Sequence, residues 1–213
     1  TWGNVSGVDR ATGVMAIKPS GIAYEKLSPA DMVIVSLKSG DVIEGAYRPS
    51  SDTLTHLHLY RSFKNIGGIA HAHCTYGTSF SQALREIPCL GTTHADTFYG
   101  AIPVTRSLSN NEIEADYELN TGRVIVECFC QRHLDPAKTP GVLVASHAPF
   151  TWGPTPEKAV ENAIVLEFSA KLARHTLDLS PKTQPILQGL LNRHFLRKHG
   201  PRAYYGQHEK HAI

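Results

Sequence analysis

The chain has 213 residues, of which 41% are hydrophobic and 19% are charged, and its formal net charge is +2. This composition is typical of one folded domain with a sizeable core, and it excludes a disordered or fibrous chain. The small net charge gives no electrostatic reason to expect nucleic acid or an anionic membrane as a partner. No apolar run reaches the roughly 20 residues that span a bilayer. The four cysteines form no C-x-x-C pair, and free thiols are typical of a reducing cytoplasm, where we expect this protein.

The first part of the chain predicts strands joined by tight turns. Residues 1–6 (TWGNVS) are typical of a strand and a turn, and residues 14–17 (VMAI) predict a strand that ends at a Pro-Ser-Gly turn. Ser28 begins a short helical turn with Pro at its first position. The apolar residues 32–37 and residues 42–44 flank a Gly-Asp turn and predict a hairpin.

The next segments predict two helices around a buried strand. The hydroxyl-rich residues 50–53 (SSDT) cap a helix that runs to about Phe63, with Leu54, Leu57 and Tyr60 together on its apolar face. Residues 67–73 (GGIAHAH) predict a buried strand that ends in a His-x-His pair. A helix over about 76–86 follows, because Pro88 prevents its continuation.

The second half of the chain alternates helices and strands. A polar loop at 91–96 (GTTHAD) leads to a short strand at 102–104, and Ser109 caps a longer helix that we expect to be interrupted near Gly122. Cys128 and Cys130 lie on that helix, and we expect both to be buried free thiols.

The C-terminal third adds a strand over 141–147 (GVLVASH) and helices over about 156–177 and 184–198. The alternation of strands and helices predicts a layered α/β domain, and the hairpin argues against an all-parallel sheet.

Three histidines at strand ends predict a metal site. Alternate side chains of a strand lie on one face, so His71 and His73 project together. His147 ends a second apolar run in the same way. Three imidazoles that leave one coordination position open are a ligand set of catalytic zinc. A His-x-His pair taken alone is more typical of surface or structural histidines.

Two acids have alternative interpretations. Asp52 lies at a helix N-terminus, where capping is its simplest role. Asp96 ends the polar loop GTTHAD, and this position is as typical of a turn as of a general acid or base.

Three polar loops are suited to binding phosphate. They contain Asn4 beside Gly3, Lys18 with Ser20 and Gly21, and Ser50 with Ser51. The last pair also precedes a helix, whose N-terminal amides and dipole favour an anion. None of the loops matches the glycine-rich fingerprint of a nucleotide site. A small phosphorylated metabolite is therefore a better candidate ligand than ATP or NAD.

Six motifs resemble, in the same order, those of the class II aldolase/epimerase family, and within it the L-ribulose-5-phosphate 4-epimerases. They are TWGNVS (1–6), IKPSG (17–21), PSSDT (49–53), GTTHAD (91–96), HAPFTWG (147–153) and RKHGPRAYYGQ (197–207). The resemblance implies an α/β fold with three layers, α/β/α, around a central mixed, mostly antiparallel sheet. A helix precedes the first strand in that family, so we expect residues 1–213 to form a single domain that lacks its natural N-terminal helix.

The resemblance also implies a role for each candidate residue. The implied ligands of one zinc per subunit, or of another divalent metal, are His71, His73, His147 and, as a further ligand or near-ligand, Asp52. The implied phosphate site of a small ketopentose consists of Asn4, Lys18, Ser20, Gly21, Ser50 and Ser51. The implied acid/base pair is Asp96 with Tyr205, which would arrive from a neighbouring subunit of a homotetramer. The implied supporting residues are Thr92, His194 and Arg197.

The implied activity is that of an isomerase that interconverts L-ribulose 5-phosphate and D-xylulose 5-phosphate. Because C4 carries no acidic hydrogen, inversion requires cleavage and re-formation of the C3–C4 bond, with the metal stabilising an enediolate. Asp96 would need a raised pKa to act as the acid. The implied pathway is arabinose or ascorbate breakdown.

Two alternatives remain open. A class II sugar-phosphate aldolase is the closer one, although such aldolases tend to carry Glu where this chain has Asp52. A non-catalytic, adducin-like assembly domain is the more remote one, because it would not be expected to retain all three histidines.

Overall fold

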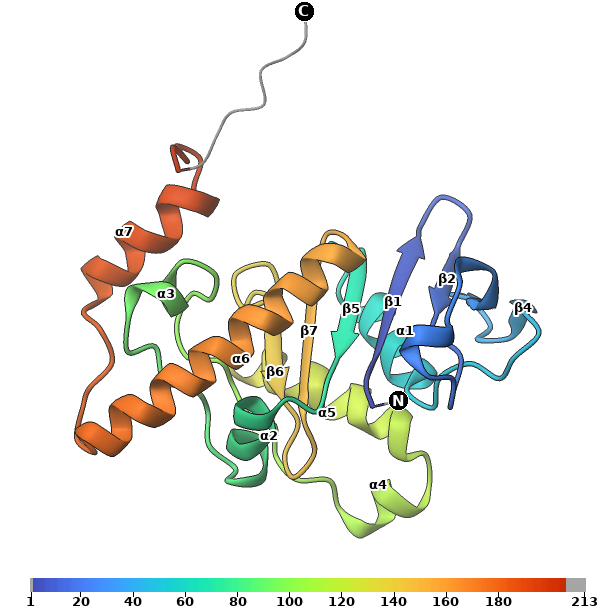
Figure 1. Ribbon diagram of the computed structural model, residues 1–213, viewed down its shortest axis with the longest axis horizontal. Helices are drawn as coiled ribbons and strands as arrows, with labels where there is room; N and C mark the ends of the chain where they lie inside the picture. Colours follow the sequence, from blue (N-terminus) through green and yellow to red (C-terminus); the bar gives the residue numbers. More distant parts are fainter. Residues whose placement is uncertain (1, 206–213) are drawn as a thin grey trace, which may run out of the picture.

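The structure is a computed structural model that describes residues 2–205. Thr1, Gly206 and Gln207, which belong to two of the motifs above, lie outside the described residues. A seven-stranded sheet has the strand order β4-β3-β2-β1-β5-β7-β6 (Figure 1). The strands are β1 (Asn4–Asp9), β2 (Val14–Ile17), β3 (Val33–Ser36), β4 (Val42–Glu44), β5 (Gly68–His71), β6 (Gly141–Leu143) and β7 (Pro149–Gly153).

Every ladder between these strands is antiparallel, and an isolated bridge between Val104 and Leu143 is parallel. The expected α/β fold with a mostly antiparallel sheet is therefore confirmed. The helices that cover the sheet and its edges are α1 (Thr53–Ser62), α2 (Thr75–Gln82), α3 (Thr92–Ala95), α4 (Asn110–Glu114), α5 (Tyr117–Gln131), α6 (Pro156–Leu179) and α7 (Gln188–His199).

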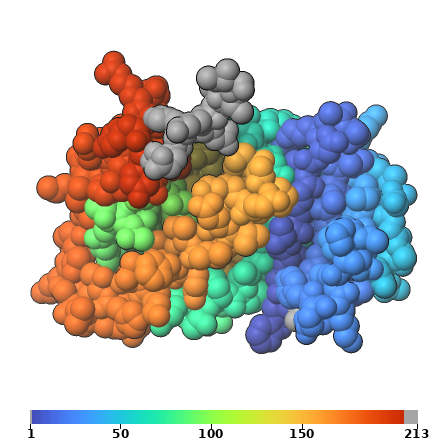
Figure 2. Space-filling view, turned by 45° about the horizontal axis from the view of Figure 1, so that its top comes forward, coloured from blue at the N-terminus to red at the C-terminus, as the bar shows by residue number. Residues whose placement is uncertain are grey.

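The two faces of the sheet bury different clusters. On one face, Phe150 and Trp152 of β7 belong to a core cluster that also takes in side chains of α1 and α5. On the other face, Thr151 donates a hydrogen bond to the carbonyl of Ala159 in α6. Helices thus lie on both faces, and α6 crosses the front of the sheet (Figure 1). In Figure 2, α6 lies between α7 and the N-terminal strands.

Several elements differ from the sequence-based expectations. β7 was not predicted, and residues 102–104 form only isolated bridges rather than a strand. α2 ends at Gln82 instead of continuing to residue 86. The predicted helix interruption lies at 115–116, between α4 and α5, while Gly122 continues the helix.

Two side chains that the sequence predicted to be buried are exposed. Leu54 is 41% exposed, because α1 turns Leu57 and Tyr60 toward the core and Leu54 away from it. Cys128 is buried but Cys130 is exposed, since residues two apart lie on different faces of a helix. Within residues 2–205, no helix is both long enough and apolar enough to span a membrane.

Candidate metal centre and active site

Three histidines meet at one end of the central strands. The Nε2 atoms of His71 and His73 are 3.1 Å apart, and one nitrogen from each of His71, His73 and His147 lies within 4.8 Å of the others. His71 is the last residue of β5, and His147 lies in the turn between β6 and β7. The end of one central strand and the turn of the β6–β7 hairpin therefore converge on one point.

The tautomer of His71 is fixed by its surroundings. Its Nδ1–H donates to the carbonyl of Pro149 at 2.8 Å, because a carbonyl oxygen can only accept. The Nε2 lone pair is left to face the other two histidines, as in second-shell control of a metal ligand. Burial, followed by the nearby His147, lowers the pKa of His71 to about 3, so this imidazole is neutral at physiological pH.

His147 is held by a tight turn. Its backbone N–H donates to the carbonyl of Val144 at 3.0 Å, and the preceding Ser146 has a φ of +58°, a conformation that non-glycine residues seldom adopt. Nδ1 of His147 lies 3.3 Å from the hydroxyl of Tyr117 in α5. Tyr117 lies on the helix that the sequence predicts after Ser109, and the residue pattern gives no signal for this contact with the site.

The three side chains suit a divalent metal. Zinc–nitrogen bonds of about 2.0–2.1 Å at tetrahedral angles hold two ligand nitrogens about 3.3 Å apart, and the 3.1 Å between His71 and His73 is close to this value. His71 is buried, His147 is half-buried and His73 is exposed. The cluster is thus anchored in the core on one side and open to solvent on the other.

Asp52 lies beside this cluster instead of capping its helix. It occupies the position before α1, but within the described residues its side chain makes no capping hydrogen bond. Its carboxylate accepts a 2.6 Å hydrogen bond from Asn4 Nδ2 and lies 3.9 Å from Nε2 of His71. The capping role, which spacing alone favoured, is therefore wrong for the side chain.

The residues expected to bind phosphate come together beside the histidines. The backbone N–H of Ser50 donates to the carbonyl of Lys18, and that of Ser20 to the carbonyl of Arg48. These bonds align the loop of Lys18, Ser20 and Gly21 with the turn of Ser50 and Ser51. Asn4 lies next to this turn, because its side chain donates a hydrogen bond to the following residue, Asp52.

Within that group, Lys18 is the charged member. Its side chain is buried, and burial lowers its pKa. Nζ donates to the carbonyl of Pro19 at 3.1 Å and lies 4.9 Å from the ring centre of Tyr24. Ser20, Gly21 and Ser51 are exposed, so the group presents hydroxyls and backbone amides to solvent with a cation behind them.

A buried polar network supports the site from beneath. Ser6 Oγ lies 2.7 Å from Nδ1 of His56 and 2.9 Å from the hydroxyl of Tyr60. Burial lowers the pKa of His56 to about 3. The sequence gives no signal for this role of His56, because helix periodicity does not reveal that its face meets the strand bearing Asn4.

A second polar cluster surrounds Asp96. Its carboxylate accepts from Arg197 Nη2 at 2.9 Å and from His194 Nδ1 at 3.0 Å. The ring of Tyr205, which is 57% exposed, lies 4.4 Å from the Arg197 guanidinium carbon. Thr92 is also close, because its carbonyl accepts the backbone N–H of Asp96.

The environment of Asp96 differs from the one its proposed acid role requires. Burial acts to raise its pKa, but the hydrogen bonds from Arg197 and His194 outweigh burial, and the pKa lies below its usual value. The raised pKa that the sequence-based mechanism called for is absent from this arrangement.

The two clusters do not meet within one copy of the chain. For residues 2–205, no hydrogen bond or ion pair joins Asp96 or Tyr205 to the three histidines. Figure 1 shows α3 and α7 at the left, well apart from the lower end of β5. The residues predicted to act together thus form two groups on separate parts of the surface.

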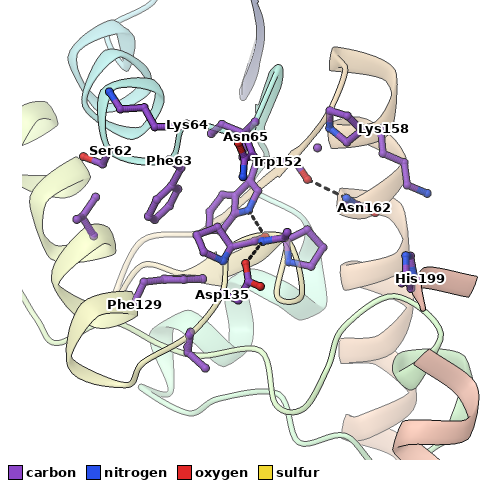
Figure 3. A pocket seen from close by; sticks show the side chains of 18 of the residues that line it. Ser62, Phe63, Lys64, Asn65, Phe129, Asp135, Trp152, Lys158, Asn162 and His199 are labelled. Atoms are coloured by element: carbon purple, nitrogen blue, oxygen red, sulfur yellow. Dashed lines mark hydrogen bonds between the residues drawn. The ribbon is translucent and has the colours of Figure 1, made fainter. Parts of the chain in front are cut away.

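A cavity of ≈ 740 Å³ lies elsewhere, at the opposite ends of β5 and β7. Phe63, Phe129 and Trp152 form an aromatic cluster beside it, and Lys158, Asn162 and His199 lie on another side (Figure 3). No residue of the predicted site lines it. This cavity is therefore separate from the histidine cluster.

Comparison with known proteins gives consistent matches. The profile of the family described as "Class II Aldolase and Adducin N-terminal domain" matches residues 1–174. An L-fuculose 1-phosphate aldolase structure superposes with a TM-score of 0.75 at 24% identity, covering 91% of this chain and 84% of the other.

Two further structures have the same fold. The L-fuculose 1-phosphate aldolase from Glaciozyma antarctica has a TM-score of 0.70 at 21% identity, covering 91% of this chain and 71% of its own. The enzyme of that name from Thermus thermophilus has a TM-score of 0.63 at 24% identity, covering 84% of this chain and 86% of its own.

Proposed function

Because the chain belongs to the family of class II aldolase and adducin N-terminal domains, we propose that it is a metal-dependent sugar-phosphate enzyme. Class II aldolases use a divalent metal, typically zinc. The observation that carries the proposal is the cluster of His71, His73 and His147, whose ligand atoms lie within 4.8 Å of one another. These residues would hold the ion, which supplies a Lewis acid for the carbonyl end of a sugar substrate.

The specific reaction we propose is the interconversion of L-ribulose 5-phosphate and D-xylulose 5-phosphate. Asp52 supports this reaction over an aldolase reaction, because aldolases of the family tend to carry Glu at this position. The shorter carboxylate is held by Asn4 at the edge of the histidine cluster. In this position it can complete the ligand set, and it is less suited to reach a substrate carbon as a base.

The phosphate end of the substrate has a separate proposed site. Lys18 supplies the positive charge, Ser20, Ser50 and Ser51 supply hydroxyls, and Gly21 and Ser51 supply backbone amides. The N-terminus of α1, which follows Ser51, adds a favourable dipole for an anion. Because Asn4 contacts Asp52, this group borders the histidines, as a short phosphorylated sugar requires.

The proposed acid/base pair requires a second copy of the chain. Asp96 and Tyr205 both lie around Arg197 and are apart from the histidines of their own chain. We therefore propose that a neighbouring subunit, in a homotetramer, delivers both groups together, with Thr92, His194 and Arg197 holding them. Entry of substrate between the subunits would loosen the Arg197 pair and allow the pKa of Asp96 to rise.

A second candidate function is a sugar-phosphate aldolase. The structural neighbours named above are L-fuculose 1-phosphate aldolases. Both reactions break a carbon–carbon bond with the same metal and phosphate sites. They differ in whether the fragments stay bound and recombine or leave the enzyme.

A product assay distinguishes these functions. Zinc-loaded protein is incubated with L-ribulose 5-phosphate, and the products are separated with and without a chelator. We expect D-xylulose 5-phosphate, formed without free fragments and only when metal is present. Release of dihydroxyacetone and glycolaldehyde phosphate would favour the aldolase. Absence of any turnover of these substrates in the zinc-loaded protein would contradict the proposed reaction.

A further inference from the structure

His73 differs from the other two histidines in what fixes its position. β5 ends at His71, so His73 lies beyond the last strand residue. The N–H of Ala72 is 3.5 Å from the carbonyl of Pro149, which is at the long limit of a hydrogen bond. The next residue, Cys74, is the N-cap of α2. The position of His73 therefore depends on where α2 begins.

Glu167 of α6 holds that helix end. Its carboxylate accepts the backbone N–H groups of Tyr76, at 3.0 Å to both oxygens, and of Gly77, at 2.8 Å. These two N–H groups are the ones that an N-cap side chain normally satisfies, but Cys74 makes no capping hydrogen bond. A carboxylate at a helix N-terminus is also favoured by the helix dipole.

The contact between Glu167 and α2 is closely packed on both sides. On α6, the neighbouring Leu166 is fully buried in a core cluster. On α2, a Cβ added at Gly77 would lie 2.6 Å from Cγ of Pro149 and 2.8 Å from Sγ of Cys74. The start of α2 is thus packed directly against Pro149, whose carbonyl accepts the Nδ1–H of His71.

We propose that Glu167 is a positioning residue for the metal centre: it caps α2 from a neighbouring helix and thereby fixes His73 against His71. This inference rests on the proposed metal site. The side chain of Glu167 does not itself belong to the ligand cluster, so it acts through the backbone of Tyr76 and Gly77. Outer-shell partners of metal ligands typically change metal affinity by about 10–100-fold.

The test is zinc affinity of the full chain, measured by competition with a chromophoric chelator. Glu167→Gln keeps the size of the side chain but removes its charge and one acceptor oxygen. We expect its zinc affinity to fall by about 10-fold or more and the visible spectrum of bound Co²⁺ to change. Glu161→Gln is the matched control, because Glu161 is on the same helix, is exposed and pairs with Lys158 at the surface.

A rescue variant separates positioning from general stability. Cys74→Ser adds a capping hydroxyl at the start of α2, so in the Glu167→Gln background it should restore zinc affinity and the Co²⁺ spectrum. Wild-type affinity and spectrum in Glu167→Gln would overturn the role of Glu167 alone. A wild-type chain that binds neither zinc nor Co²⁺ would overturn the metal centre as well.

Discussion

Burial controls the protonation of several single residues. Desolvation lowers the pKa of His56 and His71 to about 3 and that of His94 to about 4, against about 6.5 in an unfolded chain. Between these values the unfolded chain binds more protons than the folded one, so the free energy of unfolding rises with pH. Each histidine contributes at most about 1.4 kcal/mol per pH unit in that range.

The resulting prediction concerns acid stability. We expect the metal-free protein to keep its full histidine-linked stability above about pH 6.5 and to lose several kcal/mol by about pH 5. Urea unfolding at pH 7.5 and pH 5.0, with a chelator present, measures the difference. His94→Gln should reduce the pH dependence, because it removes one of the three groups. An equal or higher urea midpoint at pH 5.0 would show that these imidazoles are not buried in the neutral form.

Residue types and spacing predicted the histidine cluster, but they did not predict the side-chain contacts around it. The alternation rule brought His71 and His73 together, although His73 lies beyond the end of β5. The hydrogen bond from Asn4 to Asp52, and the contact of Tyr117 with His147, depend on side-chain directions that no local pattern encodes. For the same reason, Asp52 was expected to be a cap.

At the scale of elements, α6 carries much of the packing. Leu166 is fully buried in a cluster with Phe80 and Ala170, whereas Leu179 at the end of the helix is 89% exposed. We expect Leu166→Ala to lower the free energy of unfolding by about 2–5 kcal/mol. Leu179→Ala, the matched control, should change it by less than about 0.5 kcal/mol. Similar losses in the two variants, by urea unfolding, would contradict the packing described for α6.

The elements that the sequence missed have physical explanations. All five residues of β7 are buried, and the strand begins with a proline and ends with a glycine, so its short Phe-Thr-Trp pattern is masked by residues that are typical of turns. Gly122 does not break α5, because the helix needs a small residue there: an added Cβ would lie 3.0 Å from Cβ of His58 in α1. The chain turns instead at Ala115, and alanine is not a residue type that predicts a turn.

At the scale of the whole molecule, the separation of the two polar clusters is the main finding. The proposed reaction needs the metal ligands and the acid/base pair side by side, and within one copy of the described chain the histidines and the Asp96 group lie apart. The sequence placed Tyr205 on a neighbouring subunit only through family resemblance. α7 packs onto α3, and Arg197 of α7 donates a hydrogen bond to Asp96. A neighbouring subunit that contributes Tyr205 would therefore contribute Asp96 as well.

This separation predicts complementation between inactive variants. His73→Ala lacks a metal ligand but keeps Tyr205, and Tyr205→Phe keeps the histidines but lacks the phenol hydroxyl. If each site combines two copies, random mixed assemblies should regain about a quarter of the sites. Activity of mixed and of separate samples is compared after dissociation and reassembly. Mixed assemblies with no activity above that of the separate variants would contradict a shared site.

The most direct measurement is the metal content of the purified chain and its variants after equilibration with zinc. We expect one ion per wild-type chain, and a loss of this ion in His73→Ala and His147→Ala, because each removes one of three imidazoles in the cluster. His175→Ala, which changes an exposed histidine of α6, should keep the full amount. Zinc retained at the wild-type level in both cluster variants would contradict a metal centre formed by His71, His73 and His147.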